Sequence, residues 1–396
     1  MKKRYFILVL ISSIIIAVLI TSHRTNLSHQ MVNSISSMCI FQNPKMSRLR
    51  GPCDPPSISS CFINDHALQK KIKAGLPDWG KEQIKTDLSK FTTISTKDLD
   101  NYFNKHRSKH NQLVRFKINN GKVMDSTNYF ETNPKQILPA NNKTETICKD
   151  PRISAITYVL EYLVKNNYIS DTDFILGLND YVITVDSDPV PIFTFAKDLA
   201  IPGEKDLILI PDWHNLSSLP ALMPMIRKEN ELHPWESKKE ILFWRGGSGL
   251  DSTGFRNEIV EFSKHHQDKI DAKFCDVPQY VPPEDHLNYK YLISIDGGRC
   301  SWERFIWHLH SNSLIFKHES TQVQWYYNGL KPYVHYIPVK DGNAILTQLA
   351  WAKSHESEVQ QIIKNASTFV DSNLELEDLY HYIAVLLQEY TKKLNN

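Results

Sequence analysis

The alternation of apolar and polar residues predicts strands and helices along most of the second half of the chain. Apolar runs of strand length occupy residues 241–244, 291–295, 313–317 and 333–337. Apolar residues at one-face helical spacing predict helices that begin at Phe255 and that span 302–309, 344–354, 356–370 and 376–394. Because strands alternate with helices here, the pattern predicts an α/β doubly wound sheet.

The first half has shorter elements. Helical stretches are predicted between 66 and 99, and strand-like alternation runs from 113 to 130, with Asn119-Asn-Gly121 as a hairpin signal. Pro151 opens an amphipathic helix, and short strands are predicted at 174–178, 181–185, 192–195 and 207–210. Prolines and polar residues between 219 and 234 suggest a crossing between two lobes.

The N-terminus carries a targeting signal. Residues 1–4 are basic after Met1, and residues 5–22 form an uncharged, mostly apolar run that is just long enough to span a bilayer. We interpret it as an uncleaved signal anchor, with a cleaved signal peptide as the alternative. The body of the chain would then be translocated. This predicts a single-pass type II membrane protein that faces the ER or Golgi lumen, or alternatively a bacterial inner-membrane protein.

Two further features fit a lumen. The chain has six cysteines, and an even number behind a translocation signal suggests disulfides. Asn26, Asn142, Asn215 and Asn365 each begin a sequon for N-glycosylation. A net charge of +2 and a pI near 8.1 favour neither a nucleic-acid partner nor an acidic tail, so specificity must come from local sites.

The segment 296–304 links a predicted strand to a predicted helix. Gly297 and Gly298 give it the freedom of a tight turn, and Ser301 suits a helix N-cap. Arg299 and Arg304 place two guanidiniums at this helix N-terminus, where a polyanion such as a pyrophosphate would compensate them. Alternatively, Arg304 pairs with a neighbouring acid such as Glu303.

A second glycine turn, 245–249, follows the strand at 241–244 and is followed by Arg256 in a predicted helix. It has neither the Gly-Lys-Ser/Thr of a Walker loop nor the glycine spacing of a Rossmann fingerprint. Both turns would lie at the carboxyl edge of one sheet, where ligands bind in such folds.

The order of these motifs resembles a known family. Phe243-Trp-Arg-Gly-Gly, Tyr289-Lys-Tyr-Leu-Ile, the 296–304 turn and the segment 330–339 occur in the order seen in glycosyltransferase family 90. That family includes Rumi-like protein O-glucosyl/xylosyltransferases, capsule xylosyltransferases and lipopolysaccharide-modifying glycosyltransferases. The resemblance covers roughly residue 154 to the C-terminus.

The resemblance implies a GT-B-type fold, in which two Rossmann-like lobes enclose a cleft, and an inverting, metal-independent reaction. The donor would be UDP-glucose or UDP-xylose as co-substrate, with no other cofactor, and the acceptor a hydroxyl of a protein or glycan. The expected parts before the lobes are a cytoplasmic tail (1–4), a signal anchor (5–22) and a stem (23–60). An N-terminal acceptor lobe (61–230), a C-terminal nucleotide-sugar lobe (231–375) and a C-terminal helix (376–396) would follow.

The predicted donor-binding residues come from the two glycine turns and the helices after them. They are Arg245, Gly246, Gly247, Ser248, Arg256, Asp296, Gly297, Arg299, Ser301 and Arg304. The loop between Arg245 and Arg256 is longer than in the family, which leaves open whether Gly247 or Ser248 takes the role of the family's serine.

An inverting transfer also needs a carboxylate to accept the proton of the acceptor hydroxyl. In the family it precedes the helix that here begins near Pro151, so Asp150 and Glu145 are the candidates. Asp150 is preferred, although a helix N-cap alone would also explain it. Asp180 and Asp212 each follow a strand and could line the cleft.

Two other functions are compatible with the sequence. Asp186 and Asp188, in an Asp-x-Asp after a strand, could hold the divalent ion of a metal-dependent GT-A enzyme, or form only a polar turn. The chain could also be a luminal carbohydrate-binding module without turnover. The histidines show no metal-ligand spacing and are interpreted as helix-surface residues.

Overall fold

The computed structural model describes residues 63–106, 113–126, 150–179, 190–249, 251–275 and 281–395, all within a compact unit that spans Arg48–Asn396. In this described part, no helix is long and apolar enough to cross a bilayer. The expected tail and anchor lie outside these residues, as do the stem, the strand at 181–185, Glu145, Asp180, Asp186 and Asp188. Those predictions therefore stay predictions.

The first sheet contains both antiparallel and parallel strands. Its order is β3-β2-β4-β5-β7, with β3 at Lys122–Ser126, β2 at Leu113–Asn119, β4 at Thr172–Gly177, β5 at Ile192–Thr194 and β7 at Ile208–Leu209. The strands β2 and β3 form the predicted hairpin, whose turn residues Asn120 and Gly121 have φ of 50° and 71°. From β4 onward the neighbours run parallel.

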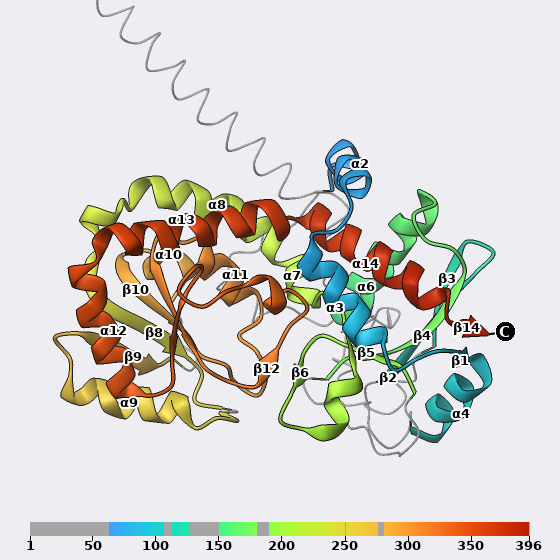
Figure 1. Ribbon diagram of the computed structural model, residues 1–396, viewed down its shortest axis with the longest axis horizontal. Coiled ribbons are helices and arrows are strands. Elements are labelled where there is room, and N and C mark those ends of the chain that lie inside the picture. The colour runs from blue at the N-terminus through green and yellow to red at the C-terminus, as the bar shows by residue number, and fades with distance from the viewer. Residues whose placement is uncertain are drawn as a thin grey trace, which may run out of the picture. The chain divides into compact units, whose positions relative to one another are not determined.

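The second sheet is entirely parallel and confirms the α/β prediction. Its order is β13-β11-β10-β8-β9, with β13 at Ile337–Val339, β11 at Leu314–His318, β10 at Tyr289–Ser294, β8 at Lys239–Gly246 and β9 at Ile270–Phe274. Figure 1 shows it on the left, with α9 (Phe255–His265), α11 (Glu303–Leu309), α12 (Gly342–Ser354) and α13 (Glu356–Asn373) around it.

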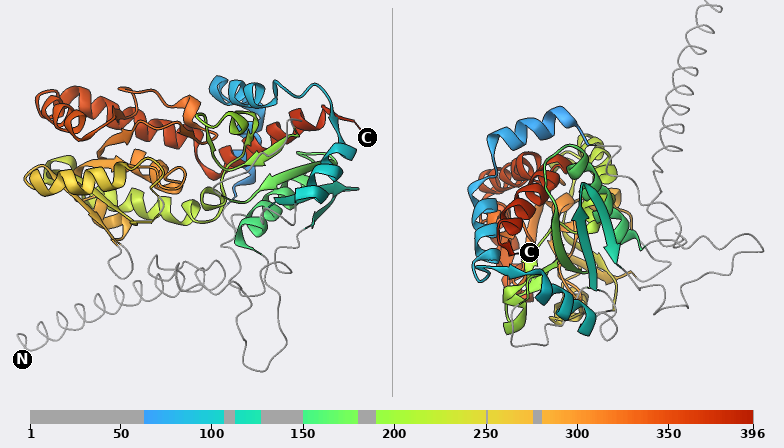
Figure 2. Two further views of the ribbon diagram at one scale, coloured as in Figure 1. Left: turned by 90° about the horizontal axis from the view of Figure 1, so that it is seen from below. Right: turned by 90° about the vertical axis from the view of Figure 1, so that its right-hand side faces the viewer.

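The last long helix, α14 (Leu376–Thr391), lies against elements from the start of the chain. It contacts α2 (Asp65–Ala74), α3 (Asp78–Leu88), α6 (Pro151–Lys165) and β4. Figures 1 and 2 show the red α14 next to the blue α3. Its buried residues, among them Leu379, Ile383 and Leu387, belong to the same hydrophobic core as the first sheet. The C-terminal helix therefore covers the sheet that the first half of the chain builds.

Two short pairings and several short elements complete the described part. The strands β6 (Lys197–Asp198) and β12 (Gln322–Val323) pair antiparallel, and β1 (Ile94–Ser95) pairs parallel with β14 (Leu394–Asn395). The remaining elements are α4 (Thr96–His106), α7 (Trp213–Ser217), α8 (Leu219–Leu232), α10 (Pro283–His286) and the 3-10 helices η4 (Pro202–Asp206), η5 (Trp235–Ser237) and η6 (Tyr327–Gly329). Because β6 and β12 come from different halves of the chain, their pairing joins those halves.

Two predicted elements are wrong. The segment 333–337 is not a strand: Tyr333 has φ of 60°, which breaks an extended chain, and β13 begins only at Ile337. The segment 219–234 is largely the helix α8, not an irregular crossing. One proline of α8 stands in its first turn, where the missing N–H costs nothing, and Pro224 is tolerated inside it.

The luminal features need correction where the structure describes them. Cys275 and Cys300 are buried free thiols, which leaves any disulfide to the other four cysteines, all outside the described residues. The side chain of Asn215 is buried, so a glycan there would disrupt the packing of α7. Asn365, on α13, is partly exposed and remains an acceptor that a glycan could reach.

A buried carboxylate joins α3 to the first sheet. Asp87 accepts hydrogen bonds from Lys197 Nζ at 2.5 Å, Leu209 N at 2.9 Å and Gln83 Nε2 at 2.9 Å. Both Asp87 and Lys197 are almost fully buried, so neither charge has water to replace its partner.

Asp87→Asn should destabilise the protein by about 3–5 kcal/mol, because it leaves the Lys197 ammonium buried without a counter-charge. The measurement is the urea midpoint of unfolding by circular dichroism. Asp78→Asn is the control, since Asp78 and its partner Lys81 are both solvent-exposed. A midpoint for Asp87→Asn as high as that of the control would contradict this account.

Candidate active site at the two glycine turns

The first turn leads from β8 into α9 and holds Arg245 and Arg256 in different ways. The Arg245 guanidinium stacks over the Phe243 ring at 4.3 Å and donates to Asp271 Oδ2 at 2.7 Å. The charge of Arg245 is therefore already paired with a carboxylate. Arg256, in the first turn of α9, donates to two backbone carbonyls of the described residues, those of Asp296 at 3.1 Å and Gly247 at 3.2 Å.

The second turn leads from β10 into α11 and is built around Asp296, which is fully buried. Its Oδ2 accepts from Lys317 Nζ at 2.7 Å and from the Ser320 hydroxyl at 2.6 Å, while its Oδ1 accepts from Ser301 N at 3.0 Å. Asp296 thus shapes the turn, and both of its oxygens accept hydrogen bonds from the protein. Its predicted role in binding the donor stays a prediction.

Ser301 is not the helix cap that the sequence predicts. Trp302 takes the N-cap position with φ of 53° and ψ of −137°, and the Ser301 hydroxyl contacts that of Ser294 at 2.7 Å. This backbone conformation is sterically unfavourable for a tryptophan and costs about 1–3 kcal/mol.

The two glycine turns are joined directly. Gly297 O accepts hydrogen bonds from Ser252 N at 3.1 Å and Ser252 Oγ at 2.7 Å, and Gln322 donates to that same hydroxyl at 2.7 Å. Sequence reasoning missed Ser252, Gln322 and Lys317, because their partners lie up to 70 positions away along the chain.

Arg256 and Arg304 form a pair of positive charges at this junction. Arg304 Nη1 donates to Arg245 O at 2.8 Å, and neither guanidinium has a carboxylate partner among the described residues. Burial lowers the pKa of Arg256 from its ordinary value, and the nearby charge of Arg304 lowers it further. A Cβ at Gly297 would lie 2.4 Å from Arg256 Nη2, so the glycine leaves the space that this guanidinium occupies.

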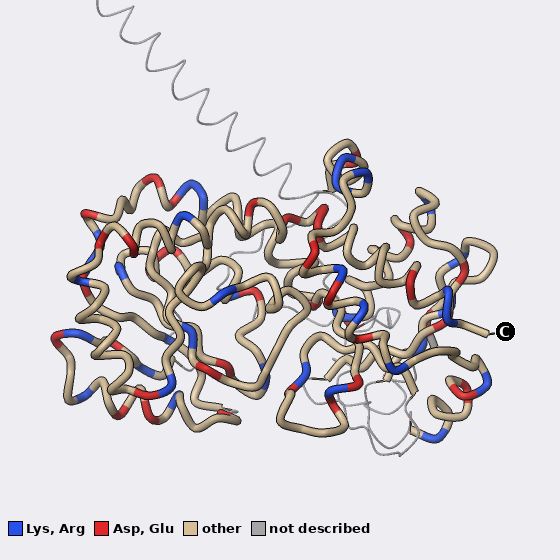
Figure 3. Tube along the Cα trace, in the orientation of Figure 1, with Lys and Arg blue, Asp and Glu red and all other residues tan. Residues whose placement is uncertain are grey.

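This charge is local. Figure 3 shows acidic and basic residues interspersed along the chain, in keeping with a net charge of only +2. The Arg256–Arg304 pair has no ion-pair partner among the described residues, although the charges of Asp251 and Asp296 partly oppose the lowering of the Arg256 pKa. Because it lies at the edge of a parallel sheet, the pair is the candidate site for an anion with several negative oxygens.

Comparison with known proteins identifies the family. The sequence pattern of glycosyl transferase family 90 matches residues 80–396. The chain belongs to glycosyl transferase family 90. The resemblance carried by the two glycine turns is confirmed.

Family 90 relatives include named proteins. Protein O-glucosyltransferase 2 of Danio rerio is 26% identical over 335 residues, which cover 78% of this chain and 61% of that protein. Protein O-glucosyltransferase 1 of Rattus norvegicus is 26% identical over 292 residues, 66% of this chain and 72% of that protein. Protein O-glucosyltransferase 3 of Homo sapiens is 24% identical over 259 residues, 59% of this chain and 50% of that protein. The chain therefore spans about half to three quarters of these relatives.

Solved structures are only distantly similar. A structure of Anabaena HepE in complex with UDP superposes with a TM-score of 0.31 and 7% identity, over 60% of this chain and 77% of that one. A glycosyltransferase from Rickettsia africae superposes with a TM-score of 0.34 and 11% identity, over 67% of this chain and 88% of that one. These scores are too low to support an argument about the site.

In this family 90 chain, Arg299 does not join the arginine pair. Its guanidinium, almost fully buried, pairs with Glu204 of η4, and Asp198 Oδ2 lies 3.7 Å away. The expected clamp of Arg299 with Arg304 around one anion is therefore not formed. Arg299 links the second turn to the segment after β6, in the first half of the chain.

The remaining residues of the first turn are placed as follows. Gly246 ends β8 and is buried, Gly247 accepts from Arg256, and Ser248 is exposed. The choice between Gly247 and Ser248 for the family's serine role stays open.

Asp150 is the N-cap of α6 and an ion-pair partner. Its Oδ1 accepts from Arg152 N at 2.8 Å and its Oδ2 from Arg152 Nη2 at 2.6 Å. The side chain is almost fully buried. These contacts hold the carboxylate in one orientation, and its role as a base stays a prediction.

Asp212 is fully buried, and only one of its two carboxylate oxygens has hydrogen-bond partners among the described residues. Its Oδ1 caps α7 through His214 N and Asn215 N, while its Oδ2 has no hydrogen-bond partner. The pKa of Asp212 is raised to about 7, chiefly by burial and also by the charge of Glu303, while His214 and the two cap bonds oppose the rise.

The prediction that the histidines lie on helix surfaces fails for His308 and His310, which are buried. Burial lowers the pKa of His308 well below its usual range, and both its ring nitrogens lack partners. Within the described residues, no group of three or more His, Cys, Asp or Glu could hold a metal ion.

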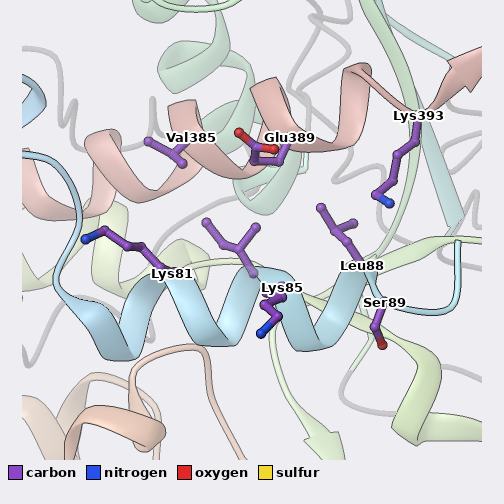
Figure 4. A pocket seen from close by; sticks show the side chains of 8 residues that line it. Lys81, Lys85, Leu88, Ser89, Val385, Glu389 and Lys393 are labelled. Carbon is purple, nitrogen blue, oxygen red and sulfur yellow. The ribbon is translucent and has the colours of Figure 1, made fainter. Parts of the chain in front are cut away.

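A pocket of about 560 Å³ lies elsewhere, between α3 and α14. Figure 4 shows its apolar floor, with Leu88 and Val385, and the lysines around it. Its lining residues include none from the glycine turns, so it is not the anion site.

The raised pKa of Asp212 gives a pH dependence with a defined sign. An unfolded aspartate ionises near pH 3.9, whereas folded Asp212 ionises near 7, so folding favours the protonated form between these values. Its contribution to stability is present below about pH 4 and is lost as pH rises through 7. Compared with Asp212→Asn, the free energy of unfolding of the parent should therefore fall by about 1.4 kcal/mol per pH unit between pH 4 and pH 7. Urea unfolding at several pH values measures this, and parallel stability curves for the two proteins would refute it.

Proposed function

We propose that the protein is an inverting glycosyltransferase that moves a sugar, glucose or xylose, from a UDP-sugar to a hydroxyl of a protein or glycan acceptor. The observation that carries this proposal is the Arg256–Arg304 pair, which lacks a carboxylate partner in the described chain. A diphosphate supplies oxygens in number and geometry for two guanidinium forks.

Three other findings support the proposal. The chain belongs to a family of glycosyl transferases, and named relatives are protein O-glucosyltransferases. The site lies at the carboxyl edge of a five-stranded parallel sheet, where nucleotides bind in α/β folds. The first sheet, which is mixed, would belong to the acceptor lobe of a GT-B arrangement, and the β6–β12 pairing connects the two halves of the chain.

In the transfer, Arg256 and Arg304 would hold the diphosphate and neutralise the charge that grows on it as the sugar leaves. The acceptor oxygen would attack the sugar carbon while a carboxylate accepts its proton. We propose Asp150 for this base, because Arg152 fixes its orientation, and Glu145 as the next candidate.

Arg304→Ala should weaken UDP binding by about 1.5–3 kcal/mol while leaving the fold intact, because it removes a charge-assisted contact from a partly exposed side chain. Arg304→Lys should also weaken binding, since an ammonium cannot form two parallel hydrogen bonds. Isothermal titration calorimetry with UDP measures both.

Arg227→Ala is the matched control, because Arg227 pairs with Asp371 and Glu375 on other elements. UDP binding by Arg304→Ala as tight as that of the control would exclude the anion site. Release of UDP from UDP-glucose should be insensitive to chelator. Activity lost on chelation and restored by manganese would instead favour Asp186 and Asp188.

Asp150→Asn should keep UDP affinity and slow UDP release from UDP-glucose by roughly 10²–10⁴-fold, because an amide can still cap α6 but cannot accept a proton. Asp173→Asn is the control, since Asp173 is likewise a shielded partner of an arginine, Arg115. If Asp150→Asn turns over at the rate of the control, Asp150 is only a cap and Glu145→Gln is tested next.

A further inference from the structure

A cluster of two tryptophans, a histidine and a glutamate lies beside the arginine pair. Trp213 and His214 begin α7, which follows the first sheet, and Trp302 and Glu303 begin α11, which follows the second glycine turn. The rings of Trp213 and His214 are 3.8 Å apart, and those of His214 and Trp302 6.4 Å. His214 Nδ1 lies 3.7 Å from Glu303 Oε2. The cluster thus brings together side chains from both halves of the chain.

This cluster is open to a ligand. The side chains of His214 and Glu303 are 29% and 27% exposed, and both tryptophans are partly exposed. Apolar aromatic faces combined with a few polar groups are typical of small-molecule sites.

Two observations indicate that the cluster is built for binding. The strained backbone of Trp302 persists only because its surroundings hold it, and such strain gathers at ligand sites. Beneath the surface, Asp212 keeps a fully buried Oδ2 that has no hydrogen-bond partner among the described residues. Buried polar atoms are rarely left unpaired, so Asp212, directly before Trp213, keeps hydrogen-bonding capacity that the described residues do not use.

We propose that Trp213, His214, Trp302 and Glu303 form the subsite for the pyranose ring that the donor carries. The indole faces cover the apolar face of the ring, and His214 and Glu303 exchange hydrogen bonds with its hydroxyls. The inference rests on the proposed function. Glu303 and Arg304 are successive residues in the first turn of α11, so the cluster and the arginine pair both include the start of this helix.

The test compares two ligands that differ only by the sugar. The variants are Trp213→Ala, Trp213→Phe and Glu303→Gln, and the measurements are the Kd for UDP by calorimetry and kcat/KM for UDP release from UDP-glucose. Trp351→Ala is the matched control: Trp351 also stacks on a neighbouring histidine, His355, at 5.0 Å, but on α12.

Trp213→Ala and Glu303→Gln should bind UDP with the parent's Kd, while kcat/KM for UDP-glucose falls roughly tenfold or more. Trp213→Phe should retain most of the parent's kcat/KM, because it keeps an aromatic face. Trp351→Ala should retain the full kcat/KM of the parent. If Trp213→Ala and Glu303→Gln both had the same kcat/KM as the parent, the proposed sugar subsite would be wrong. Equal losses of UDP affinity and kcat/KM would also overturn it, because the cluster would then only support the anion site. A parent protein that binds no UDP would instead refute the proposed function.

Discussion

The arrangement of the site depends on one electrostatic constraint: two guanidiniums, Arg256 and Arg304, lie near each other. Among the described residues, both donate to backbone carbonyls, and Arg256 also lies over the Trp244 ring. Carbonyl dipoles orient the side chains without cancelling their charge. Burial and mutual repulsion lower the pKa of Arg256, which is the electrostatic cost of keeping the pair together. An anion placed between the two would recover that cost as binding free energy.

Three other charged side chains at the two turns have partners of their own. Asp296 is bonded to Lys317, Ser320 and the turn backbone, so it fixes the turn before α11 and offsets only part of the charge of Arg256. Arg245 is neutralised by Asp271, and Arg299 by Glu204. The second glycine turn therefore leads to two kinds of arginine: Arg299, which joins the halves of the chain, and Arg304, which we propose binds a ligand.

Much of this was predictable from local sequence pattern. The strands β8, β10 and β11, the helices α9, α11 and α14, and the presence of arginines after two glycine turns all follow from spacing and turn residues. What could not be predicted depends on long-range contacts. The Arg299–Glu204 pair joins residues 95 positions apart, and the burial of Asp212 and His308 depends on packing between distant elements. Tyr333 and Trp302 adopt positive φ against their intrinsic preference, which no local pattern signals.

A diphosphate, not the nucleoside, should supply most of the affinity at the two turns. The most direct measurement is calorimetric binding of UDP, UMP and uridine to the parent protein at one salt concentration. We expect affinity to fall steeply from UDP to UMP and again to uridine, and a higher salt concentration to weaken UDP most. Uridine binding as tight as UDP binding would contradict this claim.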